Sequence, residues 1–247
     1  MRLSKRLETI IDMAYCWISL QEKEEKQGLC VADVGTDHGF VPICLIERGI
    51  VGRVLALDIR KGPLLRAREH VQNQGLQERI ALRLGDGLKP LKPGEAQLVI
   101  MTGMGGELML RILKESPQIR ETVRCWIFSP QSELSWFRYG LKELGLAIRD
   151  EVMLQEDGKY YVIMKAEPGE MYYSEEYQYR YGEQLIRKKS QVLAEYLEQE
   201  IQKFQKIREQ IQKTARAETV GAKERLQEVE EEIEQAKKVR ELLGKTI

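Results

Sequence analysis

The chain has 247 residues, of which 43% are hydrophobic and 32% are charged, and its 39 basic residues balance 39 acidic ones. This length suits one large domain, or one domain with an appendage, and can bury a core without disulfides. The longest apolar runs, Ile43–Ile46 and Leu98–Met101, fall far short of the roughly 20 residues that span a bilayer. The basic start leads into an amphipathic pattern rather than a signal peptide. We therefore expect a cytoplasmic protein that does not associate with membranes.

The four cysteines stand at positions 16, 30, 44 and 125, without a C-x-x-C pair. A zinc site needs ligands at short spacing, and the chain has only two histidines to complete one. We expect the cysteines to be small buried side chains in a reducing compartment and the protein to hold no metal.

Short β-branched runs alternate with helical patterns over residues 1–168. Ser4 is a candidate N-cap of the first helix, because the apolar residues after it recur at helical spacing. Ser132 is a candidate N-cap of a later helix that ends near Gly145. The expected strands cover 29–34, 54–58, 80–84, 98–102 and 126–128 and flank a tight turn at 156–158; further helices are expected over 40–48, 62–75 and from about 107.

Strands alternating with helices of this length predict a mostly parallel, doubly wound α/β sheet with helices on both faces. The last two strands must be antiparallel, because a tight turn joins them and parallel neighbours need a long crossover. Residues 169–247 have a different pattern, with apolar residues three and four apart over a helical stretch at 175–214 and again after a break at 215–221. This pattern predicts a helical hairpin that packs like a coiled coil. We expect two domains, 1–168 and 169–247.

Unusual residues follow four successive strands, at the edge where ligands bind to sheets of this kind. Gly35–Gly39 is a loop whose two glycines let the backbone approach a ligand closely. Asp58 ends the second strand and can accept hydrogen bonds from both hydroxyls of a ribose. Asp86–Gly87 offers a carboxylate to an adenine amino group, and the fourth loop, 102–106, is almost free of side-chain bulk. Together the loops predict a nucleoside-type ligand.

The charge of the first loop favours one nucleoside over another. A dinucleotide site has the pattern G-x-G-x-x-G, whose backbone amides hold a pyrophosphate. Asp37 stands where the middle glycine would be, and its carboxylate would repel phosphate but suit a cation. S-adenosylmethionine carries a sulfonium and an ammonium and no phosphate, and the closing antiparallel strand pair suits a Rossmann-like class I methyltransferase better than a dehydrogenase. We therefore expect S-adenosylmethionine as the cofactor.

Four segments stand out along the chain: Leu3-Ser4-Lys5-Arg6-Leu7, Asp33-Val34-Gly35-Thr36-Asp37-His38, Arg83-Leu84-Gly85-Asp86-Gly87-Leu88 and Thr102-Gly103-Met104-Gly105-Gly106. With the helical tail behind them, they resemble the bacterial tRNA (adenine-22-N1)-methyltransferase family over the whole chain. The resemblance implies methyl transfer from S-adenosylmethionine to N1 of an adenine in the D-arm region of tRNA. The family more usually has Ser at position 36 and Ala at position 102, where this chain has Thr.

Methyl transfer from a sulfonium to a ring nitrogen is an in-line displacement, so the enzyme has chiefly to position and desolvate the reactants. The residues expected at the reacting atoms shape the donor pocket or leave room for the adenine ring. They are Asp37, His38, Gly103 and Met104. The residues expected to bind the cofactor are Asp33, Gly35, Asp37, Gly39, Asp58, Ile59, Asp86, Gly87 and Gly103. The other histidine, His70, lies in a charged helical stretch and is expected at the surface.

Three clusters of basic residues are candidates for contact with tRNA phosphates. They are Arg2, Lys5 and Arg6 at the start; Arg60, Lys61, Arg66 and Arg68 after the second strand; and Arg187, Lys188 and Lys189 in the tail. Ordinary surface cations balanced by nearby acids explain each cluster equally well. Phosphate contacts would make tRNA affinity fall steeply with salt.

Two alternatives remain open at this level. The chain could be a class I methyltransferase for a small molecule or a protein, although a small substrate would not need a helical arm. It could also be a non-catalytic scaffold that binds a protein partner through the helical hairpin. The acids Asp58 and Asp86 weigh against a scaffold.

Overall fold

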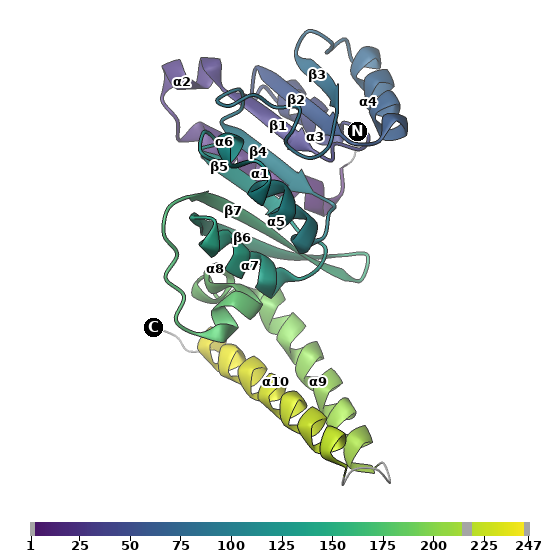
Figure 1. The fold of residues 1–247 in the computed structure, drawn as a ribbon, viewed down its shortest axis with the longest axis vertical. Helices are drawn as coiled ribbons and strands as arrows, with labels where there is room; N and C mark the ends of the chain where they lie inside the picture. The colour runs from purple at the N-terminus through teal and green to yellow at the C-terminus, as the bar shows by residue number, and fades with distance from the viewer. Residues whose placement is uncertain (1–2, 214–218, 245–247) are drawn as a thin grey trace. The chain divides into compact units, whose positions relative to one another are not determined.

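The computed structural model describes residues 3–213 and 219–244 and divides into two compact units, Met1–Tyr172 and Tyr173–Ile247 (Figure 1). Within the described residues, none of the helices combines the length and apolar character needed to traverse a bilayer. The two units are taken in turn.

The first unit is built on a seven-stranded sheet with the order β3-β2-β1-β4-β5-β7-β6. The first five strands are parallel, and β7 runs antiparallel to both β5 and β6. This arrangement confirms the predicted doubly wound sheet and its final antiparallel pair. The strands are β1 (Cys30–Val34), β2 (Arg53–Asp58), β3 (Ile80–Leu84), β4 (Leu98–Thr102), β5 (Cys125–Ser129), β6 (Leu146–Glu156) and β7 (Lys159–Pro168).

Helices cover both faces of the sheet. Alternation along β5 shows the two faces: Cys125 and Ile127 belong to the core cluster beneath α1 and α3, whereas Phe128 meets Phe137 of α7 edge to face at 5.1 Å between ring centroids. The helices of this unit are α1 (Lys5–Ser19), α2 (Lys23–Gly28), α3 (Phe40–Glu47), α4 (Lys61–Asn73), α5 (Gly106–Lys114), α6 (Pro117–Arg120) and α7 (Leu134–Glu143).

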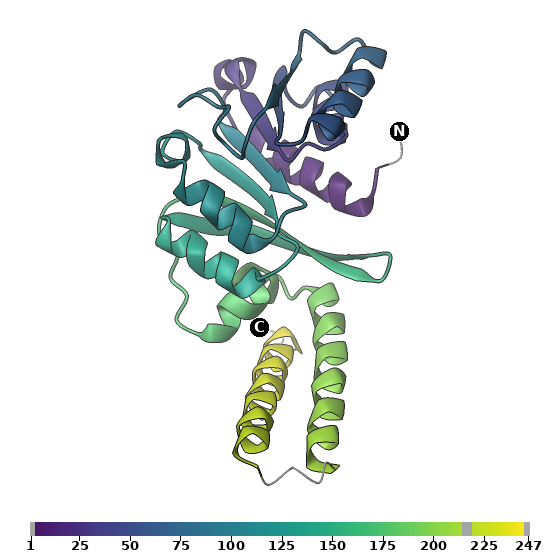
Figure 2. The same ribbon diagram turned by 45° about the vertical axis from the view of Figure 1, so that its right-hand side comes forward.

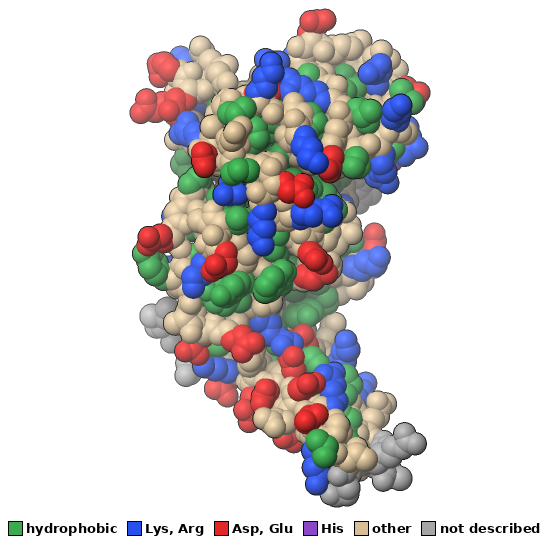
Figure 3. Space-filling view, viewed as in Figure 1, with side chains coloured by type: hydrophobic (Ala, Val, Ile, Leu, Met, Phe, Trp, Pro, Cys, Tyr) green, Lys and Arg blue, Asp and Glu red, His purple; other side chains and the backbone are tan. Residues whose placement is uncertain are grey.

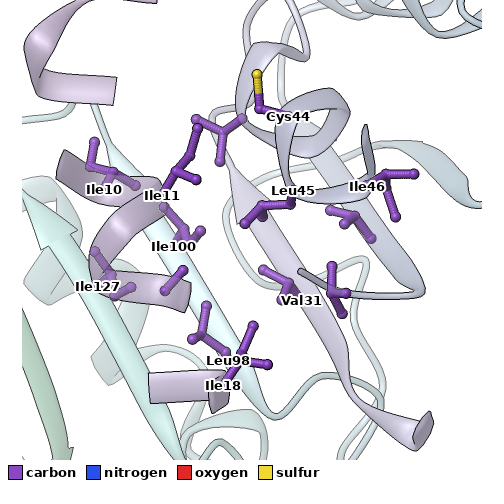
Figure 4. Close-up of a cluster of buried hydrophobic side chains, with 14 of the residues drawn as sticks. Ile10, Ile11, Ile18, Val31, Cys44, Leu45, Ile46, Leu98, Ile100 and Ile127 are labelled. Carbon is purple, nitrogen blue, oxygen red and sulfur yellow. The ribbon is translucent and has the colours of Figure 1, made fainter. Parts of the chain in front are cut away.

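The core between the sheet and its first helical layer is made of aliphatic side chains. Figure 4 shows Ile10 and Ile11 of α1 and Leu45 of α3 over the strand residues Val31 and Ile100. Each of these five side chains is fully buried. Burial on this scale fixes the sheet beneath the loops and holds their strand ends in register.

Two predicted helix starts have different outcomes. Ser4 is the N-cap of α1, and its side chain accepts a hydrogen bond of 3.3 Å from the Leu7 amide, as predicted. Ser132 is not the N-cap of α7. Glu133 holds that position in the left-handed region, with φ of 54°, and the Ser132 hydroxyl donates to Glu133 Oε2 at 2.9 Å. The Ser132 carbonyl accepts a hydrogen bond from the Gly106 amide, so this residue contacts the fourth loop.

The second unit is helical, and its two long helices form the predicted antiparallel pair (Figures 1 and 2). The predicted helical stretch at 175–214 is divided, because Lys189 adopts a positive φ of 52° and ends one helix before the next begins. The expected break at 215–221 lies largely outside the described residues. The elements are η1 (Gln178–Gly182), α8 (Glu183–Arg187), α9 (Gln191–Lys213) and α10 (Val220–Gly244).

Candidate active site

A cavity of about 580 Å³ opens at the carboxyl ends of the parallel strands. The strand order reverses between β1 and β4, and this switch point is where ligands bind to open α/β sheets. Ten predicted cofactor-binding and catalytic residues line the cavity: Asp33, Gly35, Asp37, His38, Asp58, Ile59, Asp86, Gly87, Gly103 and Met104. Gly39 is not among the lining residues; it is buried, and an added Cβ there would lie 3.2 Å from Ala67 Cβ of α4.

The loop after β1 is held in shape by main-chain hydrogen bonds. The amides of Gly35 and Thr36 both donate to the Leu57 carbonyl of β2, at 2.8 and 2.9 Å. Gly35 has a positive φ of 78°, a conformation that glycine adopts at little cost. Asp37 also has a positive φ, of 50°, and its side chain is exposed to the cavity. The loop therefore presents the Asp37 carboxylate where the sequence predicted a cation-binding acid.

Asp58 joins the loops after β1 and β2. Its carboxylate is 3% exposed and accepts hydrogen bonds from the Asp37 amide at 3.2 Å and the Arg60 amide at 2.8 Å. The Arg60 guanidinium lies 3.7 Å from Asp58 and 3.9 Å from Asp37. Each carboxylate oxygen has a second lone pair, so Asp58 can still accept hydrogen bonds from a ligand in the cavity.

Asp33 lies at the base of the cavity and is 2% exposed. Burial raises the pKa of this carboxyl to about 7; the Thr36 hydroxyl acts in the opposite direction, and the Asp58 carboxylate adds to the rise. A positively charged ligand would favour the ionised form of Asp33 and lower its pKa again. The acids of this cavity are therefore suited to a cation.

The third loop has an acid with a partner of its own. Asp86 Oδ2 lies 2.7 Å from Lys89 Nζ, and this hydrogen bond lowers the pKa of Asp86. Gly87 packs so closely against Ile112 of α5 that an added Cβ would lie 2.7 Å from Ile112 Cγ2. In the predicted pair Asp86–Gly87, Asp86 thus places a charged side chain at the rim of the cavity. Gly87 stands where a larger residue would displace the Ile112 side chain.

The fourth loop meets a segment that the sequence reasoning missed. The Met104 carbonyl accepts a hydrogen bond of 2.9 Å from the amide of Gln131, which lines the cavity after β5. Gln131 could have been predicted, because it is a polar residue just after a strand end, as are the acidic site residues that follow earlier strands. Leu108, Arg111 and Ile112 of α5 also line the cavity.

The two histidines lie close together, and His38 lines the cavity. The His38 ring stacks on Phe40 at 5.4 Å between centroids, and Phe40 stacks on His70 at 5.3 Å. His70 Nδ1 lies 2.9 Å from the His38 carbonyl, which can only accept, so Nδ1 carries the proton. His70 is half-buried, and the expectation of a surface role was wrong because α4 packs this side chain against the first loop.

The predicted RNA-binding residues are dispersed. Arg6 and Arg60 line the cavity, whereas Lys5 is exposed outside it, and Arg2 lies outside the described residues. The last three are exposed in the second unit, at the end of α8 and in the turn after it: Arg187, Lys188 and Lys189. Basic and acidic side chains are interspersed on the face drawn in Figure 3, so contacts with RNA would depend on individual positions.

No three or more His, Cys, Asp or Glu side chains are grouped as metal ligands within 3–213 and 219–244. The model of the family TrmK, tRNA (adenine(22)-N(1))-methyltransferase, matches residues 31–238. The chain belongs to this family.

Relatives of this chain match it over nearly its whole length, both in sequence and in structure. The Bacillus subtilis (strain 168) tRNA (adenine(22)-N(1))-methyltransferase is 32% identical over 244 residues, which cover 97% of each chain. The B. subtilis m1A22 tRNA methyltransferase structure has a TM-score of 0.81 at 31% identity and covers 97% of this chain and 99% of that one. Streptococcus pneumoniae Sp1610 in complex with S-adenosyl-L-methionine has a TM-score of 0.78 at 31% identity, covering 97% and 100%.

Membership of the tRNA (adenine(22)-N(1))-methyltransferase family confirms the resemblance that the four sequence segments carry. The two solved structures superpose on 97% of this chain, so they share the fold described above over both units. The acid-lined cavity of this chain lies at the edge of the sheet that the residues after the strands predicted.

Proposed function

We propose that the chain transfers a methyl group from S-adenosylmethionine to N1 of the adenine at position 22 of tRNA. The observation that supports this most directly is the cavity at the switch point of the sheet, which four aspartates line. They are Asp33, Asp37, Asp58 and Asp86. The chain belongs to the tRNA (adenine(22)-N(1))-methyltransferase family.

The side chains that line the cavity suit this cofactor. Carboxylates attract a sulfonium and an ammonium, and Asp58 has acceptor capacity left for ribose hydroxyls. When bound, S-adenosylmethionine supplies an electrophilic methyl group to the lone pair of adenine N1. The residues proposed to hold the cofactor or shape its loops are Asp33, Gly35, Asp37, Gly39, Asp58, Ile59, Asp86, Gly87 and Gly103.

On the acceptor side the chain has to position an uncharged base and accommodate the positive charge that develops on it. Adenine N1 carries no proton to be removed, so a general base is not required before attack. We propose that the backbone of Gly103 and the side chain of Met104 border the adenine ring, and that Asp37 and His38 border the reacting methyl group. The Asp37 carboxylate is exposed to the cavity and can stabilise the cationic product.

The RNA has to reach this cavity, and a base in folded RNA must leave its stack before it can react. We propose that the basic residues of the first unit bind one set of tRNA phosphates and that those of the second unit bind another. The residues are Arg2, Lys5, Arg6, Arg60, Arg187, Lys188 and Lys189. We further propose that residues 1–168 form the catalytic domain, that 169–247 form a helical domain, and that the protein works in the cytoplasm.

The decisive experiment is methylation of an unmodified tRNA transcript with S-adenosylmethionine, followed by mass spectrometry of the nucleosides and mapping of the modified position. The expected result is N1-methyladenosine at position 22, and no product on a transcript with guanosine at that position. Asp58→Ala and Asp37→Ala should each lower the rate. Calorimetric binding of the cofactor without methylation of any tRNA position would instead favour another substrate.

A further inference from the structure

Three arginines line the cavity, and two of them already have carboxylate partners. The Arg60 guanidinium lies 3.7 Å from Asp58 and 3.9 Å from Asp37. Arg111 Nε lies 4.0 Å from Glu115. Arg6 differs, because no carboxylate of residues 3–213 or 219–244 forms an ion pair with its guanidinium. Arg6 therefore brings a positive charge to the cavity that the neighbouring side chains leave uncompensated.

An aromatic ring holds this charge in place. The Arg6 guanidinium carbon lies 5.1 Å from the centroid of the Tyr161 ring on β7. Glu156, at the end of β6, accepts the amides of Lys5 at 2.5 Å and Arg6 at 3.5 Å but forms no ion pair with the Arg6 guanidinium. A cation–π contact orients a guanidinium without neutralising it, and leaves its N–H donors available.

The position of Tyr161 places Arg6 on the acceptor side of the cavity. Strand β7 is separated from β1 by β4 and β5, which at a strand spacing of about 4.8 Å amounts to roughly 14 Å. Eight of the nine residues proposed to hold the cofactor lie at the ends of β1, β2 and β3 or in the loops after them; Gly103 follows β4. An anion bound by Arg6 would therefore belong to the incoming substrate, and an RNA substrate presents phosphates.

We infer that Arg6 binds a backbone phosphate of the RNA strand that carries the target adenine, and that Tyr161 is the positioning residue that holds the guanidinium toward the cavity. This inference rests on the proposed function. A guanidinium can bind two phosphate oxygens at once, so it fixes the direction of the strand as well as adding affinity. Such a contact would hold the extruded nucleotide at the depth at which N1 reaches the donor methyl group.

The test compares Arg6→Gln, Tyr161→Phe and Tyr161→Leu with the unaltered chain, using the tRNA transcript and S-adenosylmethionine. Arg53→Gln is the matched control, because Arg53 is exposed at the opposite end of β2. Binding of the transcript is measured at several salt concentrations, and binding of S-adenosylmethionine is measured separately by calorimetry. A thermal melt of each variant shows that it is folded.

Arg6→Gln is expected to weaken tRNA binding roughly tenfold and to reduce the slope of log affinity against log salt by about one, while cofactor affinity changes less than twofold. Tyr161→Phe keeps the aromatic ring and should retain tRNA affinity. Tyr161→Leu keeps an apolar side chain without a ring, so its tRNA affinity should fall toward that of Arg6→Gln.

Two results would overturn the inference alone. One is methylation by the unaltered chain together with an unchanged salt slope in Arg6→Gln. The other is loss of cofactor affinity in Arg6→Gln with tRNA affinity intact, which would assign the guanidinium to the cofactor carboxylate. Failure of the unaltered chain to methylate the transcript would instead overturn the proposed function, and this inference with it.

Discussion

The amide of Asp37 donates a hydrogen bond to Asp58 Oδ2 across 3.2 Å, and this bond ties the loop after β1 to the end of β2. Asp37 adopts a positive φ of 50° in this loop, and the carboxylate that its amide meets is buried. One acid thus orients the loop that carries the other. The two residues should not behave alike when each is replaced.

Replacement of Asp58 should affect cofactor binding more than replacement of Asp37. Asp58→Ala removes the acceptor of two backbone amides as well as the proposed ribose contact, and we expect cofactor affinity to fall by about 100-fold. Asp58→Asn retains one acceptor oxygen and should lose less. Calorimetry with S-adenosylmethionine measures both, and Asp12→Asn on the exposed side of α1 is the control. Equal affinity in Asp58→Ala and the unaltered chain would exclude a cofactor role for this carboxylate.

Much of this site could be predicted because its acids follow strands that the sequence makes obvious. Short β-branched runs locate the strand ends, and parallel topology brings those ends to one edge. Gln131 follows the end of β5 and so carried the same kind of signal as the acids, but its contact with Met104 depends on the packing of the fourth loop against this segment. His70 was misjudged for a similar reason, since its partner is a carbonyl 32 residues earlier in the chain.

The second unit shows a different limit. Residues 187–191 are all polar, but no Pro or Gly marks the turn that Lys189 makes with its positive φ. A single non-glycine residue in the left-handed region leaves little trace in a sequence. The long antiparallel helices were predictable because their buried residues recur at regular spacing: Leu193, Leu197, Ile201, Val229, Ile233 and Ala236.

Cofactor affinity should depend on pH through Asp33. Burial raises the pKa of Asp33 to about 7, so below that pH a cationic ligand has to displace a proton from it. We expect S-adenosylmethionine to bind more tightly as the pH rises from 6 to 8, because the carboxylate is then already ionised. S-adenosylhomocysteine, which lacks the sulfonium, should show a smaller change.

Asp33→Asn separates this effect from the titration of other groups. The variant should remove most of the difference in pH dependence between the two compounds, as measured by calorimetry at pH 6, 7 and 8. An unchanged difference in Asp33→Asn would assign the pH dependence to another group. The stability of the free protein should change with pH in the opposite direction to cofactor affinity. The folded state holds the Asp33 proton more strongly than the unfolded state, so the contribution of Asp33 to the free energy of unfolding declines as the pH rises from about 4 to 7.

The buried ion pair of α7 and β6 should control stability rather than catalysis. Arg138 Nε donates to Glu151 Oε1 at 2.8 Å, with side-chain exposures of 1% and 0%. Glu151→Ala leaves a buried guanidinium without this acceptor, and we expect the free energy of unfolding to fall by about 3–5 kcal/mol. Urea denaturation measures the loss, with Glu143→Ala at the exposed end of α7 as the control. A loss below about 1 kcal/mol would show that the pair is readily replaced.

Charge reversal in the second unit should weaken tRNA binding without affecting the cofactor. Arg187, Lys188 and Lys189 are exposed where α8 ends, and replacing all three by Glu turns three attractive charges into repulsive ones. We expect tRNA affinity near physiological salt to fall at least tenfold and the salt slope to become shallower, with cofactor affinity unchanged.

The matched control for this reversal has the same change in net charge. Lys203, Lys206 and Lys213 are exposed on α9, so their replacement by Glu distinguishes a local phosphate contact from the general effect of a more negative protein. A thermal melt of both variants is needed, because Lys188 and Lys189 also make contacts within the folded chain. Equal loss of tRNA binding in the two variants would point to net charge alone. Loss confined to the reversal at 187–189 would identify the end of α8 as part of the RNA-binding surface, since long-range repulsion is largely screened at this salt while a direct contact is not.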